Sequence, residues 1–148
     1  MDNELNTNEL KKLFLFQTCD DTEIAQMLTY FTSHEYFAGN AVFNEHDRGE
    51  SMYVILRGAV KIVKVSGETI IELHEGDFFG EVALFDYALR TASAAAFEDS
   101  VILEITRNEF NRLFSVAPAL VAKLLYQMMT EMSRRLRRKN NPGGGIIF

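Results

Sequence analysis

The apolar positions near the start of the chain are spaced as in short helices. Three of them share one face of a helix that is expected to begin at Glu9: Leu10, Leu13 and Phe14. Asp20, followed three residues later by Glu23, forms a capping-box pattern, so a second helix is expected to open there. Residues 1–8 are polar, and we expect them to be flexible.

The middle of the chain has a residue pattern typical of β-strands. Glycines recur there every nine or ten residues, at Gly39, Gly49, Gly58, Gly67 and Gly76. Apolar, β-branched runs of strand length follow one another at 52–56, 59–65, 69–73, 93–97 and 101–105. Glycine adopts positive φ angles without steric cost, so this spacing predicts tight turns in an antiparallel roll or barrel. Alternation is imperfect in 59–65, because Lys61 and Lys64 would face opposite sides of a regular strand; a bulge and an exposed edge both fit.

Helical spacing returns after the last strand. Helices are expected at 107–114 and 120–139, with a break at Pro118. The second helix carries one apolar stripe, made of Val121, Leu124, Leu125, Met128, Met129, Met132 and Leu136. Such a stripe either packs on its own domain or pairs two subunits, and both alternatives stay open. The helix is expected to stop before Pro142 and the glycines that follow, which leaves 140–148 as a flexible tail.

The expected plan is therefore one α+β domain over residues 9–139. It has N-terminal helices, a β-roll (jelly-roll) core and a long C-terminal helix.

The connection between residues 78 and 93 is unusually apolar for a surface loop. Gly80 permits an uncommon backbone angle, and residues 81–84 can form a helical turn directly after it. The first N–H groups of such a turn are unpaired and carry partial positive charge, which favours an anion. Arg90 can return to the same place and neutralise a phosphate oxygen. Glu81 only accepts hydrogen bonds and suits a sugar hydroxyl. Two small residues leave room for a ligand beside the main chain, Ala83 and Ala92.

This connection has a recognisable order of residues. It reads Phe79-Gly80-Glu81-Val82-Ala83-Leu84, then five residues, then Arg90-Thr91-Ala92. The pattern resembles the phosphate-binding cassette of the cyclic-nucleotide-binding domain family, which includes the bacterial catabolite activator protein and the regulatory subunit of cAMP-dependent kinase. Residues 42–58 are similar to a second family element and depart from it at His46, where the family usually has glycine. Histidine tolerates a left-handed conformation better than most residues, so we expect the turn to form.

The resemblance covers roughly Leu10 to Arg138 and implies a site and a ligand, cAMP or cGMP. The implied ligand-binding residues are Phe79, Gly80, Glu81, Val82, Ala83, Arg90, Thr91 and Ala92. Glu81 would accept the ribose 2′-hydroxyl, and Arg90 would pair with the charged phosphate oxygen. Main-chain N–H groups of Val82, Ala83 and Ala92 would complete the phosphate cradle.

The family also suggests which base is bound and what moves. A hydroxyl at Thr91 can reach the guanine 2-amino group of cGMP, but cAMP-preferring members carry threonine as well. We favour cAMP because it is the commoner ligand of the family. The last helix resembles the family's lid helix, with base-side contacts expected within 132–136, including Arg134 and Arg135. Nucleotide binding is expected to reposition that helix.

Other function classes fit less well. A metal-dependent cupin enzyme needs two histidines spaced by one residue, whereas His34, His46 and His74 are far apart. A transcription factor would continue into a helix-turn-helix, and no DNA-binding domain is expected in this chain. An interaction or sensor module that has lost nucleotide binding is the remaining alternative, and the presence of both Glu81 and Arg90 argues against it. No nucleophile elbow, phosphate loop or paired carboxylates occur, so neither catalysis, nor a cofactor, nor a metal is expected.

Charge and cysteine content limit the binding partners and the cellular compartment that we expect. Residues 1–122 contain nine basic and twenty acidic side chains, whereas residues 123–148 contain six basic and one acidic. An acidic body argues against nucleic-acid binding, and the basic run at 134–139 suits the C-terminal end of a helix. One cysteine, Cys19, cannot form an internal disulfide. No signal sequence or membrane span is evident, so we expect a cytoplasmic protein whose partners are the nucleotide and a second subunit or a regulated protein.

Overall fold

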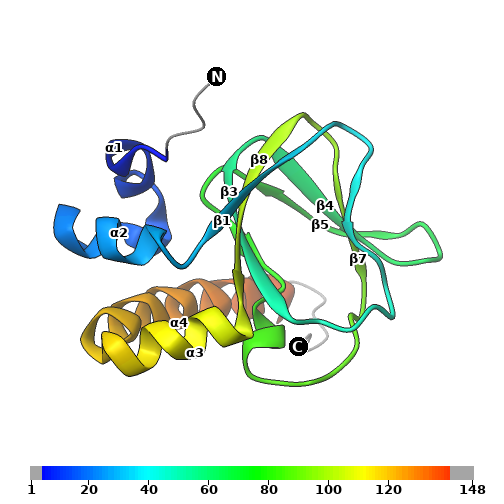
Figure 1. The fold of residues 1–148 in the computed structure, drawn as a ribbon. Helices are drawn as coiled ribbons and strands as arrows, with labels where there is room; N and C mark the ends of the chain where they lie inside the picture. Colours follow the sequence, from blue (N-terminus) through cyan, green and yellow to red (C-terminus); the bar gives the residue numbers. More distant parts are fainter. Residues whose placement is uncertain (1–4, 141–148) are drawn as a thin grey trace.

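The computed structural model describes residues 5–140 and opens with a small helical unit (Figure 1). Its elements are α1 (Thr7–Lys11), the 3-10 helix η1 (Phe14–Phe16) and α2 (Asp21–Leu28). The predicted capping box is confirmed: Glu23 N donates to Asp20 Oδ1 at 2.8 Å, and Asp20 N donates to Glu23 Oε1 at 3.0 Å. The first predicted helix is wrong in its limits. It starts two residues before Glu9, because Asn6 caps it, and it does not run on to Phe14.

The body is a roll of two four-stranded antiparallel sheets, which confirms the predicted β-roll core. The strand order is β1-β8-β3-β6 in one sheet and β2-β7-β4-β5 in the other. The strands are β1 (Thr32–Tyr36), β2 (Ala41–Phe43), β3 (Ser51–Arg57), β4 (Ala59–Val63), β5 (Thr69–His74), β6 (Phe78–Phe79), β7 (Ser93–Ala96) and β8 (Ser100–Thr106). The pattern missed β1, β2 and the two-residue strand β6. It left open a bulge or an edge in β4, and the structure places a register shift after Ile62 of this central strand.

Two apolar cores lie on opposite faces of the first sheet. Along β3, Val54 and Leu56 face the helices, whereas Tyr53 and Ile55 face the second sheet. Because successive side chains of a strand point to opposite faces, a run that is buried throughout separates two cores. The helix-side core also holds Leu10, Phe16, Met27, Leu103, Leu113 and Val121. The inner core also holds Val60, Leu73, Phe79, Ala94 and Ile102.

Four of the five recurring glycines form the predicted left-handed turns. Gly39, Gly58, Gly67 and Gly76 have φ angles between 90° and 98°. Gly58 is the most constrained, because a Cβ there would overlap Ser100 Oγ and lie 2.7 Å from Asp99 O. His46 has φ 75°, which confirms the left-handed turn expected at that position. The prediction is wrong for Gly49, whose role is described with the site.

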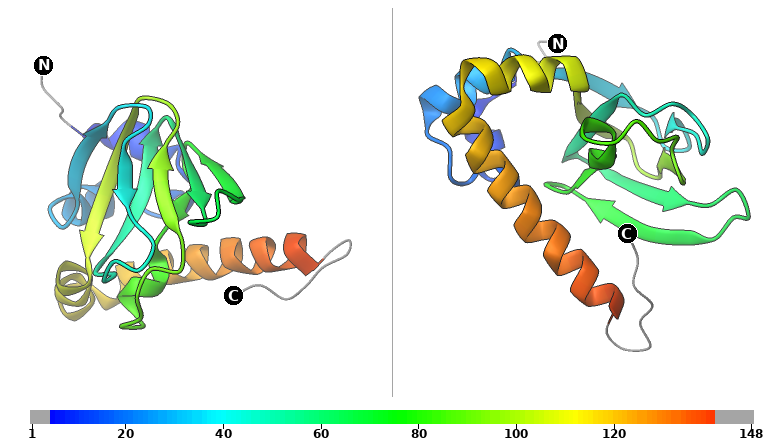
Figure 2. Two further views of the ribbon diagram at one scale, coloured as in Figure 1. Left: turned by 90° about the vertical axis from the view of Figure 1, so that its right-hand side faces the viewer. Right: turned by 90° about the horizontal axis from the view of Figure 1, so that it is seen from below.

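The chain returns to helix in α3 (Arg107–Val116) and α4 (Pro118–Asn140), which run beneath the roll (Figure 1 and the left view of Figure 2). Pro118 begins α4 instead of lying in a break, which suits its fixed φ and missing N–H. Within the predicted stripe, Val121, Leu124 and Met128 are buried against the domain, but Met129 is 64% exposed. Residues 141–148, including Pro142, lie outside the described residues. Over residues 5–140, no helix is both long and apolar enough to cross a membrane.

Candidate nucleotide-binding site

The segment predicted as a cassette folds into a strand, a left-handed glycine and a short helical turn. β6 leads into Gly80, which has φ 74° and caps the 3-10 helix η2 (Glu81–Leu84). This confirms the turn expected after Gly80. A Cβ at Gly80 would lie 2.9 Å from the Arg90 Nη1 atom, so the glycine also makes room for the arginine. The first turn of η2 therefore starts directly over the Arg90 side chain.

Arg90 is the central charged group of this segment and is only 9% exposed. Its Nη1 donates to Gly80 O at 3.0 Å, and its Nη2 donates to Ser51 O at 2.7 Å. The guanidinium carbon lies 4.0 Å from the centroid of the Phe43 ring, a cation–π distance. Burial lowers the pKa of Arg90, and the nearby Tyr53 and Glu81 oppose that shift. The arginine is thus held in place by main-chain oxygens and an aromatic face.

Glu81 and Arg90 are close enough to interact electrostatically, yet they do not form a salt bridge. Among the ion pairs within 4.0 Å in residues 5–140, none includes either side chain. Glu81 is half-buried at the start of η2. The simple structural explanation, that the two residues only stabilise each other as an ion pair, therefore does not match the geometry.

The main-chain donors of the predicted cradle differ in availability. In the described part of the chain, the N–H groups of Val82 and Ala92 have no hydrogen-bond acceptor. The Ala83 N–H is not free, because it donates to Gly80 O across 3.2 Å within the first turn of η2. Thr91 is exposed, and its carbonyl accepts a hydrogen bond from Lys64 Nζ at 2.9 Å. The Phe79 side chain is buried in the inner core and stacks on Tyr53, so only its backbone borders the site.

The loop before β3 braces the site from the other side. His46 N donates to Arg90 O at 2.8 Å, and Arg90 N donates to Asp47 O at 2.7 Å. Gly49 packs so closely that a Cβ there would lie 3.0 Å from Ala83 Cβ and 3.1 Å from Arg90 Nε. Gly49 is therefore needed for close approach of two segments, not for a positive φ.

Sequence reasoning missed the partners that hold Arg90. Ser51 acts through its carbonyl, which every residue has, so no sequence signal identifies it. Its hydroxyl donates to Glu104 Oε2 at 2.5 Å, and His34 Nε2 contacts the other oxygen of that carboxylate at 2.8 Å. Phe43 lies in the second family element, directly before the turn that contains His46, and an aromatic residue at that place was a usable hint.

The predicted base-side residues of α4 lie near the start of the cassette and near the N-terminal unit. Arg135 Nη2 donates to Phe78 O at 2.7 Å, and its guanidinium lies 4.5 Å from the Phe78 ring centroid. Arg134 lies over Phe14, with 4.9 Å between guanidinium carbon and ring centroid. In this structure both arginines thus contact protein groups beside the roll.

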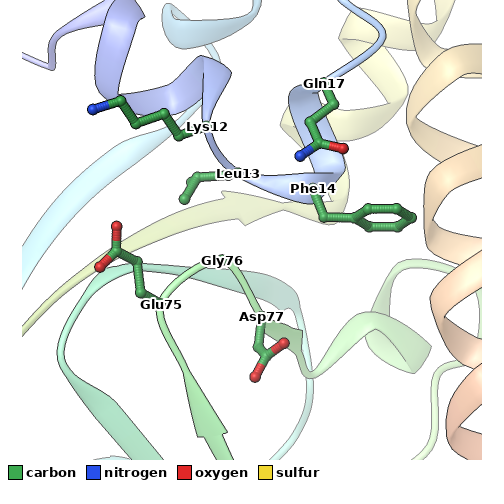
Figure 3. Close-up of a pocket in the computed structure, with 7 residues that line it drawn as sticks. All are labelled: Lys12, Leu13, Phe14, Gln17, Glu75, Gly76 and Asp77. Carbon is green, nitrogen blue, oxygen red and sulfur yellow. The ribbon is translucent and has the colours of Figure 1, made fainter.

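A pocket of about 410 Å³ opens between the N-terminal unit and the turn from β5 to β6 (Figure 3). None of the predicted site residues lines it. Its lining residues are Lys12, Leu13, Phe14, Gln17, Glu75, Gly76 and Asp77. Within residues 5–140, no three or more His, Cys, Asp or Glu side chains come together as a metal site would require.

Comparison with known proteins agrees with this fold. The model of the family described as "Cyclic nucleotide-binding domain" matches residues 33–116. The Cyclic AMP receptor protein of Thermus thermophilus is 32% identical over 127 residues, which are 83% of this chain and 57% of that protein. The chain thus spans little more than half of that relative.

Solved structures show the same architecture. The Thermus thermophilus Catabolite Activator Protein superposes with a TM-score of 0.72 at 29% identity, over 84% of this chain and 59% of that one. A cyclic nucleotide-binding domain from Methylobacillus flagellatus gives a TM-score of 0.81 over 91% of this chain and 78% of that one; at 23% identity it supports the fold alone. With a family match over more than half of its residues, this chain belongs to the cyclic nucleotide-binding domain family.

Proposed function

We propose that this chain binds cAMP in preference to cGMP at the Gly80–Ala92 cassette and that binding repositions α4. The observation that carries the proposal is the state of Arg90, a nearly buried cation without a carboxylate partner in the described residues. A buried charge is costly unless it is paired. A cyclic phosphate monoanion would supply the missing charge, and the open N–H groups of Val82 and Ala92 would supply further hydrogen bonds.

The sugar and the base would be held at the edges of this anion site. Glu81 stands at the start of η2 and offers a carboxylate to a ribose 2′-hydroxyl. The name of the Thermus relative, a receptor for cyclic AMP, supports adenine as the base. Exposed Thr91 favours a second candidate, cGMP, because its hydroxyl has no hydrogen-bond partner among the described residues and suits a guanine 2-amino group.

Titration calorimetry of the purified chain with cAMP, cGMP and linear 5′-AMP tests the proposal. We expect cAMP to bind most tightly and 5′-AMP to bind least, because the dianionic open phosphate does not fit a cradle made for a ring. Tighter binding of cGMP would make the second candidate correct. Absence of heat with both cyclic nucleotides would instead support an interaction module without a nucleotide.

The expected response of α4 follows from its attachment points. Lys123 pairs with Glu23 of α2 at 2.7 Å, and Arg135 holds the carbonyl of Phe78, two residues before Gly80. A displacement of the cassette would therefore act directly on the C-terminal half of α4 through Arg135. Amide hydrogen exchange with and without cAMP measures this. Identical protection of α4 in both states would contradict the proposed movement and leave nucleotide binding intact.

A further inference from the structure

Arg107, the first residue of α3, contacts two segments of the site that are distant in sequence. Its Nε donates to Ala83 O of η2 at 2.8 Å, and its Nη2 donates to Gly49 O at 3.0 Å. The guanidinium carbon also lies 3.8 Å from the centroid of the Tyr87 ring, further along the cassette. Figure 1 shows η2 beside the start of α3. One side chain thus joins the cassette, the loop before β3 and a helix.

These contacts connect Arg107 with the residues around Arg90. The carbonyl of Gly49 accepts from Arg107, and a Cβ on Gly49 would lie 3.0 Å from Ala83 Cβ and 3.1 Å from Arg90 Nε, closer than ordinary van der Waals contact. Backbone bonding adds to the connection, because Arg107 N donates to Glu50 O at 2.8 Å. The start of α3 and the Arg90 side chain therefore meet the same loop, because both lie against Gly49.

η2 offers its two ends to different partners. Its first N–H groups face the predicted phosphate position, whereas Ala83 O, near its last residue, accepts from Arg107. Because η2 is a four-residue turn closed by its own hydrogen bonds, it moves as a unit. A ligand that shifts its N-terminal N–H groups would therefore also shift Ala83 O. Hydrogen bonds depend strongly on distance and angle, so a guanidinium at the second end responds to small displacements.

We propose that Arg107 is the positioning residue through which the cassette sets the placement of α3. This inference rests on the proposed nucleotide binding and adds its coupling element. Arg107 has no carboxylate within 4.0 Å in residues 5–140, whereas Arg112, on the next turn of the same helix, pairs with Glu109. A second contact between the cassette and α3, the edge-to-face pair of Phe85 and Phe110, is apolar and less directional.

The test compares Arg107→Ala with Arg112→Ala, a matched control that removes an arginine from the same helix without touching the cassette. Both variants are studied as the whole chain by thermal melting, cAMP calorimetry and amide exchange with and without cAMP. Arg107→Lys is included because it keeps the charge and folds more readily, but it lacks the planar fork that reaches two carbonyls.

For Arg107→Ala we expect exchange of the Phe85 and Asp86 amides, which both donate to Val82 O, to rise about tenfold without nucleotide, since a charge-assisted hydrogen bond is lost. Affinity for cAMP should change by less than about tenfold, because Arg107 holds main chain and not ligand. The cAMP-induced change in α3 exchange should fall to less than about half, with Arg107→Lys intermediate. Arg112→Ala should match the wild type in all three.

Any other result contradicts either the coupling role of Arg107 or the proposed nucleotide binding. If Arg107→Ala retains the full cAMP-induced change in α3, or if its cassette exchange equals that of Arg112→Ala, the coupling role is wrong although nucleotide binding stands. If the wild-type chain binds no cyclic nucleotide, the proposed function is wrong; the ligand-free exchange of the two variants then still shows whether Arg107 fixes the cassette on α3.

Discussion

Removal of the Arg90 side chain perturbs the site at its centre. The guanidinium donates to the carbonyls of Gly80 and Ser51 and lies against the Phe43 ring. Arg90→Ala therefore removes the predicted phosphate partner and, at the same time, the donor of two main-chain oxygens. We expect one loss in nucleotide affinity and a separate loss in the free energy of unfolding.

The two losses differ in size. Loss of one partner from a desolvated charge pair costs about 2–5 kcal/mol, which corresponds to about 30- to 4,000-fold in Kd. Each carbonyl left without a donor costs about 1–3 kcal/mol. Burial of the charged guanidinium is unfavourable, as its lowered pKa shows, so removing the charge offsets part of this loss of stability. We therefore expect the unfolding free energy to fall by about 2 kcal/mol, less than a typical domain possesses.

Calorimetry well below the unfolding transition separates affinity from stability, and urea denaturation measures the latter. Arg48→Ala is the matched control, because Arg48 is exposed, belongs to the loop before β3 and carries the same charge. Arg90→Lys should bind with intermediate affinity, since an ammonium keeps the charge but not the fork. Unchanged cAMP affinity in Arg90→Ala, or an equal loss in Arg48→Ala, would refute the assignment of Arg90 to the phosphate.

Three further predictions concern the sugar, a turn and the attachment of α4. Glu81→Gln should weaken cAMP binding about tenfold, as for a lost charged hydrogen bond, and leave the affinity for 2′-deoxy-cAMP nearly unchanged in calorimetry; equal losses for both ligands would contradict the ribose contact. Gly58→Ala should lower the urea-derived unfolding free energy by about 2–4 kcal/mol, because φ is 98° and the new Cβ would overlap Ser100 Oγ. The hydrogen bond with Lys123 lowers the pKa of Glu23, so the pair stabilises the fold above pH 4.5 and the contribution is lost as the pH falls through the lowered folded value. Lys123→Met should reduce the urea midpoint at neutral pH but not in acid; a pH-independent difference would show that charge pairing is not the cause.

Features with a local physical cause could be predicted from the sequence. The capping box at Asp20, the turn at Gly58 and the left-handed His46 each depend on a few neighbouring residues and the backbone angles they allow. The cassette is similar in kind, since Gly80, the helical turn and the return of Arg90 all lie within one short segment. These predictions needed no knowledge of distant pairing.

Features that depend on distant pairing were missed or misread. β1 is polar in four of its five residues, and it is a strand because it forms the edge of a sheet against β8, about seventy residues later. Gly49 was expected to form a turn, but its purpose becomes visible only when Ala83 and Arg90 are placed against it. Ser51 accepts a hydrogen bond through its main-chain carbonyl, and Arg107 donates to the main-chain carbonyl of Ala83. A pattern of side chains along the sequence cannot predict such contacts.

The number of free N–H donors on Arg90 and on η2 indicates which of the two a bound nucleotide would change first. A guanidinium has five N–H donors, and the two carbonyl bonds of Arg90 leave the others available for a phosphate. Binding therefore does not require Arg90 to leave its cradle. The Ala83 N–H, by contrast, already donates to Gly80 O, and its 3.2 Å bond is long for an N–H donor, so a phosphate oxygen can compete for it. We expect the backbone amide of Ala83 to show a larger chemical-shift change than Arg90 Nε in nitrogen-edited NMR titrated with cAMP. A smaller change at the Ala83 amide than at Arg90 Nε would contradict this competition for the Ala83 N–H.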